Sequence, residues 1–338
     1  MEKQHKDIII IAEAGVNHNA SMEMARRMVV EAAKAGADYV KFQTAVPELV
    51  ISSIAPKAEY QKETTGNEQS QLEMCKAIHL PLSAYAELAG LCREHHIGFM
   101  STPFDLVSID ALAPLGMDYW KIPSGEITNL PYLRKIAKLR GRVILSTGMS
   151  TLDEVATAVN LLEENGTKRN DIYLLHCTTQ YPTPYNDVNL LAMKALESLN
   201  VGGVGYSDHT LGIEVPVAAA ALGAKIIEKH FTLDKSLPGP DHRASLDPEE
   251  LARMVKAVRH IEQALGSGQK QVAPSEKANI EVARKSIVAA CDIKKGDLFN
   301  EANITVKRPG NGISPMRWDE VIGQKAKRDF PYDSLIEI

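Results

Sequence analysis

The sequence has little that would suit a nucleic-acid-binding, membrane-spanning or disulfide-stabilised protein. Its 38 lysines and arginines are outnumbered by 43 aspartates and glutamates, so no polybasic surface is expected to bind nucleic acid or an anionic membrane. No apolar run approaches the roughly 20 residues of a spanning helix, and Glu13 interrupts the amino-terminal isoleucine run, which therefore predicts a buried strand rather than a signal peptide. The four cysteines are scattered and form no CxxC motif, so a reducing cytoplasm is the simplest location.

The sequence also lacks a G-x-G-x-x-G turn after its first strand-like segment, which disfavours a dinucleotide-binding sheet. Instead, short β-rich runs alternate with helical stretches in about eight units over roughly 265 residues, the size of one (β/α)8 TIM barrel. The expected strands are 7–13, 38–43, 97–101, 118–122, 142–146, 171–176, 204–206 and 225–227. The expected helices are 22–35, 83–95, 105–115, 130–139, 151–164, 190–199, 215–222 and 247–265.

Two stretches depart from this alternation. Residues 44–80 are polar in the middle and too long for an ordinary strand-to-helix connection, which indicates a lid or a feature on the substrate side. After the last helix, short β-like runs and turn signals replace the helical period. We therefore expect a barrel at 1–267, a linker with a short helical piece at 268–284, and a small β-rich domain at 285–338. A domain of about 50 residues is marginal alone and should pack on the barrel or on a partner chain.

Two histidines follow two apolar segments late in the chain. His209 comes after 204–206 and His230 after 225–227, with an Ala-rich helical run between them. Adjacent parallel strands would bring the two rings together at the open end of the sheet, where neutral imidazoles suit a divalent metal such as Mn²⁺, Zn²⁺ or Fe²⁺. The alternative is two unrelated polar residues at loop entrances.

Polar residues stand at the carboxyl ends of almost all the expected strands, which is where a TIM barrel carries its active site. Glu13, Lys41 and Lys121 lie inside apolar strand runs, and burying them unpaired would be costly. They could pair with an anionic ligand or a metal. The alternative is that they pair with one another and merely tie the strands together.

Nine segments of the chain resemble one family in order and in spacing. They are IAEAGVNHNAS, VKFQT, FMSTPFD, WKIPSGEITNLP, ILSTGMST, LLHCTTQYPTPYNDVNL, GYSDHT, IEKHFTLDKSLPGPDH and VKRPGNGIS. Together they resemble the sialic acid synthases, the phosphoenolpyruvate-dependent N-acylneuraminate synthases, which end in an antifreeze-like (SAF, β-clip) domain. The resemblance implies a TIM barrel, a domain-swapped homodimer, and condensation of phosphoenolpyruvate with an N-acylated hexosamine.

The resemblance also assigns roles to single positions. It makes His209 and His230 the ligands of a divalent metal, usually Mn²⁺, with Mg²⁺ or Co²⁺ as alternatives. It makes Glu126 the acid/base beside Lys121, and the alternative for Glu126 is an ion pair with that lysine. The matched phosphoenolpyruvate-binding positions are Lys41, Thr102, Lys121, Ser124, Ser146 and Ser207. The matched sugar-binding positions are Glu13, Gln43, Asn67, Tyr181, Asp241 and, lent across the dimer, Arg308.

One departure from the family concerns the pair Thr178–Thr179, where some relatives have an Asn that contacts phosphoenolpyruvate. That contact is not carried over to this chain.

The leading expectation for the reaction is synthesis of N-acetylneuraminate from phosphoenolpyruvate, N-acetylmannosamine and water. The nearest alternatives are legionaminate or pseudaminate synthesis from a diacetamido-trideoxyhexose, and synthesis of a 9-phosphate product from a 6-phosphosugar. The insertion offers only Lys57 and Lys62 as cations, which favours an unphosphorylated sugar. From another class, the chain could be an idle sugar-binding barrel, but the two histidines, Lys121 and Glu126 argue against it.

Overall fold

A computed structural model of the chain describes residues 8–66 and 68–338, and the chain divides into two compact units. The first ends at Gly266 and the second begins at Ser267. Within the described residues, no helix is both long and apolar enough to cross a membrane. All four cysteines lie among the described residues and are free thiols, as the sequence predicts.

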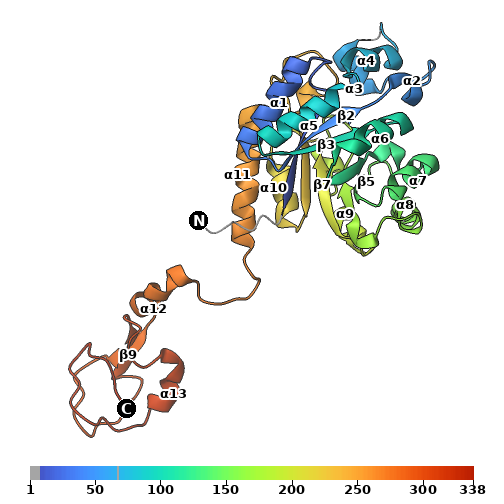
Figure 1. Cartoon of the computed structure of the whole chain (residues 1–338). Helices are drawn as coiled ribbons and strands as arrows, with labels where there is room; N and C mark the ends of the chain where they lie inside the picture. Colours follow the sequence, from blue (N-terminus) through green and yellow to red (C-terminus); the bar gives the residue numbers. More distant parts are fainter. Residues whose placement is uncertain (1–7, 67) are drawn as a thin grey trace. The chain divides into compact units, whose positions relative to one another are not determined.

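The first unit is built on eight parallel strands (Figure 1). They are β1 (Ile9–Gly15), β2 (Tyr39–Thr44), β3 (Gly98–Pro103), β4 (Tyr119–Ile122), β5 (Arg142–Ser146), β6 (Ile172–His176), β7 (Gly203–Asp208) and β8 (Ile226–His230). Their order is β3-β2-β1-β8-β7-β6-β5-β4, and the two ends of this order, β3 and β4, also contact each other. The sheet therefore closes into a barrel, which confirms the predicted TIM-barrel fold.

Helices surround the barrel (Figure 1). They are α1 (Met22–Ala35), α5 (Ala84–Glu94), α6 (Leu106–Leu112), α7 (Leu130–Lys138), α8 (Leu152–Glu164), α9 (Ala192–Glu197), α10 (Glu214–Ala221) and α11 (Pro248–Leu265). Local sequence fixes their ends. Ser21 caps α1 by accepting from the Met24 N–H, and Gly36 ends it in the left-handed region at φ 83°. Asp247 caps α11, with Pro248 as its first residue.

The insertion between β2 and α5 folds into three short helices: α2 (Pro47–Val50), α3 (Glu59–Thr65) and α4 (Gln71–Ile78). A side chain of the barrel anchors its start, because the Asp105 carboxylate accepts from the Val46 N–H at 2.8 Å. Short 3₁₀ helices lie elsewhere in the chain, at Ala113–Leu115, Ser124–Glu126, Arg169–Asp171, Tyr185–Asp187, His242–Ala244, Pro274–Glu276 and Pro315–Arg317.

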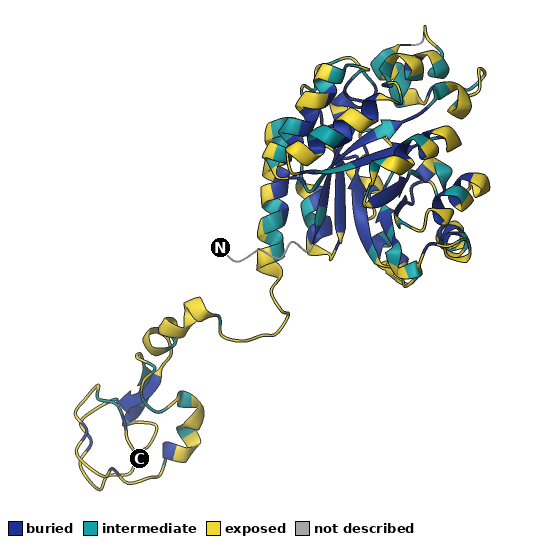
Figure 2. Ribbon diagram, viewed as in Figure 1, coloured by how far each residue is buried: buried dark blue, intermediate teal, exposed yellow. Residues whose placement is uncertain are grey.

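The barrel interior changes from apolar to polar along the strands. Side chains in a strand alternate between its two faces, so every second residue points inward. One apolar cluster, which we place inside the barrel by this alternation, is Ile11, Met100, Tyr119, Ile144, Leu175 and Ile226. Two residues further along five of the same strands stand Glu13, Thr102, Lys121, Ser146 and Glu228, all of them buried. The strands that carry both layers are dark in Figure 2. The apolar layer therefore closes the barrel beneath a polar layer at the carboxyl ends.

The second unit has its own small core. It contains α12 (Lys277–Ala283), an antiparallel pair formed by β9 (Ser286–Ala289) and β10 (Ile304–Lys307), and α13 (Trp318–Val321). Phe299 and Phe330 pack edge to face in this core, with ring centroids 5.7 Å apart. The small β-rich domain expected from the sequence is therefore present.

Candidate active site

A cavity of about 420 Å³ opens at the carboxyl ends of the barrel strands. Twelve of the predicted site residues line it: Glu13, Lys41, Gln43, Thr102, Lys121, Ser124, Ser146, Tyr181, Ser207, His209, His230 and Asp241. These residues are spread over most of the sequence, and only closure of the barrel brings them together. The cavity therefore coincides with the face on which TIM-barrel enzymes carry their active sites.

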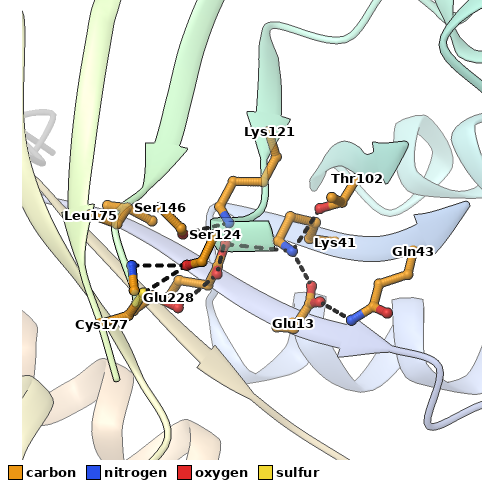
Figure 3. Close-up of polar contacts among 12 residues, drawn as sticks. Glu13, Lys41, Gln43, Thr102, Lys121, Ser124, Ser146, Leu175, Cys177 and Glu228 are labelled. Atoms are coloured by element: carbon orange, nitrogen blue, oxygen red, sulfur yellow. Dashed lines mark hydrogen bonds and ion pairs between the residues drawn. The ribbon is translucent and has the colours of Figure 1, made fainter. Parts of the chain in front are cut away.

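Two lysines and two glutamates form a buried ionic cluster at the bottom of this cavity (Figure 3). The Lys41 Nζ lies 2.7 Å from Glu13 Oε2 and 3.6 Å from Glu228 Oε2. The Lys121 Nζ lies 3.4 Å from Glu228 Oε1. The charges set inside the strands do pair with one another, as one of the sequence interpretations held. They also line the cavity, so the pairing does not remove them from a ligand's reach.

The four groups of the cluster hold their protons differently. Burial raises the pKa of Glu13, which Lys41 only partly offsets. Burial also acts to raise the pKa of Glu228, but Lys121 and Lys41 outweigh it and lower that pKa to about 2. The pKa of Lys121 is lowered by burial, whereas that of Lys41 is raised because its two carboxylate neighbours outweigh burial. Glu228 is thus the fixed anion between two cations.

Hydroxyl groups surround the two ammonium groups. Lys121 donates to Ser146 Oγ at 2.8 Å and Lys41 donates to Thr102 Oγ1 at 3.0 Å. The hydroxyl of Ser124 accepts from the Gly148 N–H at 3.0 Å, and that of Ser207 donates to Glu228 at 2.8 Å. Ammonium and hydroxyl groups that converge from five strands form a site suited to a small anion with several oxygen atoms.

His209 and His230 lie side by side at the ends of β7 and β8, with ring centroids 5.4 Å apart. The Nδ1 of His209 lies 2.5 Å from the carbonyl oxygen of Thr178. A carbonyl only accepts, so Nδ1 carries the proton and the Nε2 lone pair is free. The Nδ1 of His230 is buried, has no hydrogen-bond partner among the described residues and lies 4.0 Å from Asp241 Oδ2. Burial lowers the pKa of both histidines, so both are neutral near pH 7 and can act as metal ligands.

Aromatic rings join the histidine pair to the insertion. The Tyr181 ring packs on His209 with a centroid distance of 4.0 Å, and Tyr60 of α3 stacks on Tyr181 with a centroid distance of 5.1 Å. Asp241, beside His230, is buried, which raises its pKa to about 7. The structure therefore places Tyr181 and Asp241, two predicted sugar-side residues, directly beside the histidines.

Three predicted site residues are not in this group. Glu126 is half-buried outside the cavity lining, and its carboxylate accepts from Asn129 Nδ2 at 2.5 Å rather than pairing with Lys121. Arg308 belongs to the second unit, where it is exposed and donates through Nε to the Ala283 carbonyl oxygen at 3.0 Å. Asn67 lies outside the described residues.

The outer wall of the cavity comes from the insertion and was not predicted residue by residue. Its lining side chains are Ala45, Pro47, Val50, Ile51, Ala58, Tyr60, Gln61, Gln71, Met74, Cys75, Ile78 and His79. Among these described lining residues of the insertion, none is an aspartate, glutamate, lysine or arginine. The cavity is therefore ionic at the bottom and largely apolar at the mouth.

Comparisons with known proteins agree with this architecture. The sequence profile of the NeuB family matches residues 28–270, and that of the SAF domain matches residues 284–337. An N,N'-diacetyllegionaminic acid synthase from Campylobacter jejuni is 53% identical, with 98% of this chain and 99% of that protein covered. A second protein of that name, from Legionella pneumophila, is 46% identical, with 94% of this chain and 89% of that protein covered.

A solved structure extends the likeness to three dimensions. The crystal structure of the N-acetylneuraminic acid synthetase of Leptospira borgpetersenii, in complex with citrate, superposes with a TM-score of 0.70 at 35% identity, covering 82% of this chain and 91% of that one. The barrel with its ionic cavity bottom is thus that of a synthase, an enzyme of the transferase type, and not of an idle binding barrel. The chain belongs to the NeuB family, whose members named here are synthases of nonulosonic acids.

Proposed function

We propose that this enzyme condenses phosphoenolpyruvate with 2,4-diacetamido-2,4,6-trideoxymannose and water, giving N,N'-diacetyllegionaminate and phosphate. This departs from the leading expectation of the sequence, N-acetylneuraminate synthesis, and takes up its nearest alternative. The likeness to the two N,N'-diacetyllegionaminic acid synthases supports it, because it extends over nearly the whole chain in both cases.

The proposal rests on the contrast between the ionic bottom and the largely apolar mouth of the cavity. Phosphoenolpyruvate is a small polyanion and fits the ammonium and hydroxyl donors around Lys41 and Lys121. The aldehyde end of the sugar must reach this anion, so the far end of the sugar lies against the insertion. A wall made of Val50, Ile51 and Met74 suits a methyl and an acetamido group better than a hydroxyl or a phosphate.

The donors at the bottom of the cavity would bind both anionic groups of phosphoenolpyruvate. Lys121 with Ser146, and Lys41 with Thr102, would hold the phosphate and the carboxylate of phosphoenolpyruvate. Holding two reactants in line can supply up to roughly 7–11 kcal/mol of the barrier reduction. The Leptospira relative was solved in complex with citrate, which is also a small polyanion.

The histidine pair fits a divalent cation, and we propose Mn²⁺. The free Nε2 of His209 and the partnerless Nδ1 of His230 are the observations that favour it, since both rings are held with a lone pair to offer. No third His, Cys, Asp or Glu among the described residues completes a ready-made ligand group, so the remaining ligands would come from substrate and water. The bound cation would supply Lewis-acid polarisation of the sugar aldehyde.

The new carbon–carbon bond forms by an aldol-like addition. C3 of phosphoenolpyruvate attacks the aldehyde carbon, C2 becomes an oxocarbenium-like centre, water adds to C2, and phosphate leaves by C–O cleavage. Tyr181 and Asp241 would orient the sugar beside the histidines. A proton must leave the added water, and Glu126 is the acid/base that the family resemblance assigns.

Glu126→Gln should keep the fold and lower kcat by roughly 10²–10⁴-fold, the usual contribution of a positioned acid/base. Burial raises the pKa of Glu126, which brings it towards the range in which a carboxyl group can donate as well as accept a proton. Steady-state kinetics with both substrates saturating, beside a thermal unfolding curve, would measure this. A variant with wild-type kcat would remove Glu126 from the mechanism and leave Glu13 as the carboxyl group to test.

Arg308→Ala should raise the KM of the acylated sugar about tenfold and leave the KM of phosphoenolpyruvate unchanged. A planar guanidinium can make a bidentate contact with an amide oxygen, and the hydrogen bond of this exposed arginine to the Ala283 carbonyl oxygen uses its Nε. We propose that it serves the partner subunit of a homodimer. An unchanged sugar KM would show that this role is wrong.

The decisive experiment compares sugars in parallel. Phosphate release would be measured with Mn²⁺ and phosphoenolpyruvate, offering the diacetamido-trideoxy sugar, N-acetylmannosamine and its 6-phosphate. We expect kcat/KM for the first to exceed the others by at least tenfold, because each alternative places a polar group on the apolar wall. A preference for N-acetylmannosamine would make the chain an N-acetylneuraminate synthase, the second candidate, which the Leptospira relative favours.

A further inference from the structure

A fully buried ion pair lies behind the histidine pair, on the opposite face of the same two strands. His209 and His230 point into the cavity, and the residue before each of them points outward because side chains alternate along a strand. These outward residues are Asp208 and Lys229, partners in the register of β7 and β8. Both side chains are 0% exposed.

Three hydrogen bonds join this pair to Thr210, the residue after His209. Lys229 Nζ forms an ion pair with Asp208 Oδ2 and donates to the Thr210 carbonyl oxygen at 2.5 Å. The Asp208 carboxylate accepts from the Thr210 N–H at 3.1 Å and from its hydroxyl at 3.0 Å. The contacts link the side chain of the residue before His209 to the backbone and hydroxyl of the residue after it. We call Asp208, Thr210 and Lys229 the outer clamp.

The position of the clamp matters because the strand ladder ends there. Asp208 and Lys229 are the last registered pair between β7 and β8, so His209 is the first residue without a ladder partner on β8. Its direction into the cavity depends on the backbone of residues 208–210. Burying an ion pair costs several kcal/mol per ion before it is repaid, and apolar residues would hold two strands together at least as well.

We propose that the outer clamp is a positioning device, which holds the imidazoles of His209 and His230 at the separation required to bind a divalent cation together. The inference rests on the metal site of the proposed function. It concerns residues that touch neither cation nor substrate and act through the two histidines. Substitutions behind metal ligands typically weaken metal affinity by roughly 10–100-fold.

The test is the double variant Asp208→Asn/Lys229→Met, which leaves no unpaired charge and retains an acceptor for the Thr210 N–H. The Mn²⁺ dissociation constant would be measured by electron paramagnetic resonance on the full chain. We expect it to rise by roughly 10–100-fold, while phosphoenolpyruvate binding in the absence of metal stays unchanged. A purely structural role would weaken both together. Thr210→Val, which removes a single hydroxyl, should raise the Mn²⁺ dissociation constant a few-fold. It replaces the double variant as the test if the double variant does not fold.

The matched control is Asp38→Asn/Arg259→Met, which removes an ion pair at the other end of the barrel, where β2 begins. It should lower the melting temperature and leave Mn²⁺ affinity unchanged. Wild-type Mn²⁺ affinity in a folded clamp variant would overturn the inference and leave the metal site standing. If the wild-type chain bound Mn²⁺ no better than His209→Gln, the metal site and the inference would both be overturned.

Discussion

Removing the divalent cation with EDTA should stop phosphate release, and adding Mn²⁺ should restore it. His209→Gln and His230→Gln should each reproduce the loss with metal present. The expected fall in kcat is at least about 10³-fold, because Lewis-acid stabilisation of charge at a reacting oxygen supplies several kcal/mol and each 1.36 kcal/mol is tenfold. In His209→Gln, the glutamine keeps a donor for the Thr178 carbonyl oxygen. The loss of activity would therefore come from the missing lone pair of the ring and not from a disrupted loop.

The matched control for these variants is His176→Gln. His176 also stands at the carboxyl end of a barrel strand, but its Nε2 lies 2.7 Å from the Val188 carbonyl oxygen and the residue is outside the cavity lining. Glutamine can keep that contact, so activity should stay within about twofold of wild type. Full turnover in the EDTA-treated wild type would refute the metal proposal. Loss of activity in His176→Gln to the same degree would show that the histidine variants act through the fold.

The barrel could be predicted from the sequence because its signals are local. The caps at Ser21 and Gly36 set the bounds of α1, and an apolar run bounded by turns set those of β5, Arg142–Ser146. The predicted bounds of β7 and β8, 204–206 and 225–227, covered the smallest part of the observed strands. Glycine has a low strand propensity, so Gly203 and Gly205 do not indicate a strand. Charged residues such as Lys229 normally indicate an exposed segment. Lys229 is buried in β8 because it pairs with Asp208 on another strand, which no local pattern reveals.

The same reasoning explains which site residues were found. Glu13, Lys41 and Lys121 could be predicted as site residues because they are charged residues inside apolar strand runs. Charged side chains are rarely buried unless they are paired. Glu228 was not among the predicted site residues, although alternation places it on the same inner face as His230 two residues later. Residues 44–80 were predicted as a lid or a substrate-side feature. The individual residues of the wall could not be predicted, because α2, α3 and α4 are too short for a helical period to show which face is buried.

Lys121→Met should raise the KM of phosphoenolpyruvate by roughly 10–10²-fold and also destabilise the barrel. The first effect follows from losing an ammonium group in a buried anion site, where a charged hydrogen bond contributes about 1.5–3 kcal/mol. The second follows because Lys41, at 3.6 Å, would be the one lysine left beside Glu228 among the described residues, and breaking a buried ion pair costs about 3–5 kcal/mol. Initial-rate kinetics and denaturant unfolding would measure the two effects separately.

The double variant Lys121→Met/Glu228→Gln separates binding from stability. It removes both charges, so the free energy of unfolding should return to within about 1–2 kcal/mol of wild type, because no unpaired ion remains buried. Phosphoenolpyruvate binding should stay as weak as in Lys121→Met, since the cation is still missing. Lys135→Met, which removes a lysine from the Asp110 ion pair on the outside of the barrel, should leave that KM unchanged. Recovery of phosphoenolpyruvate binding in the double variant would mean that Lys121 serves to neutralise Glu228 and does not hold the substrate.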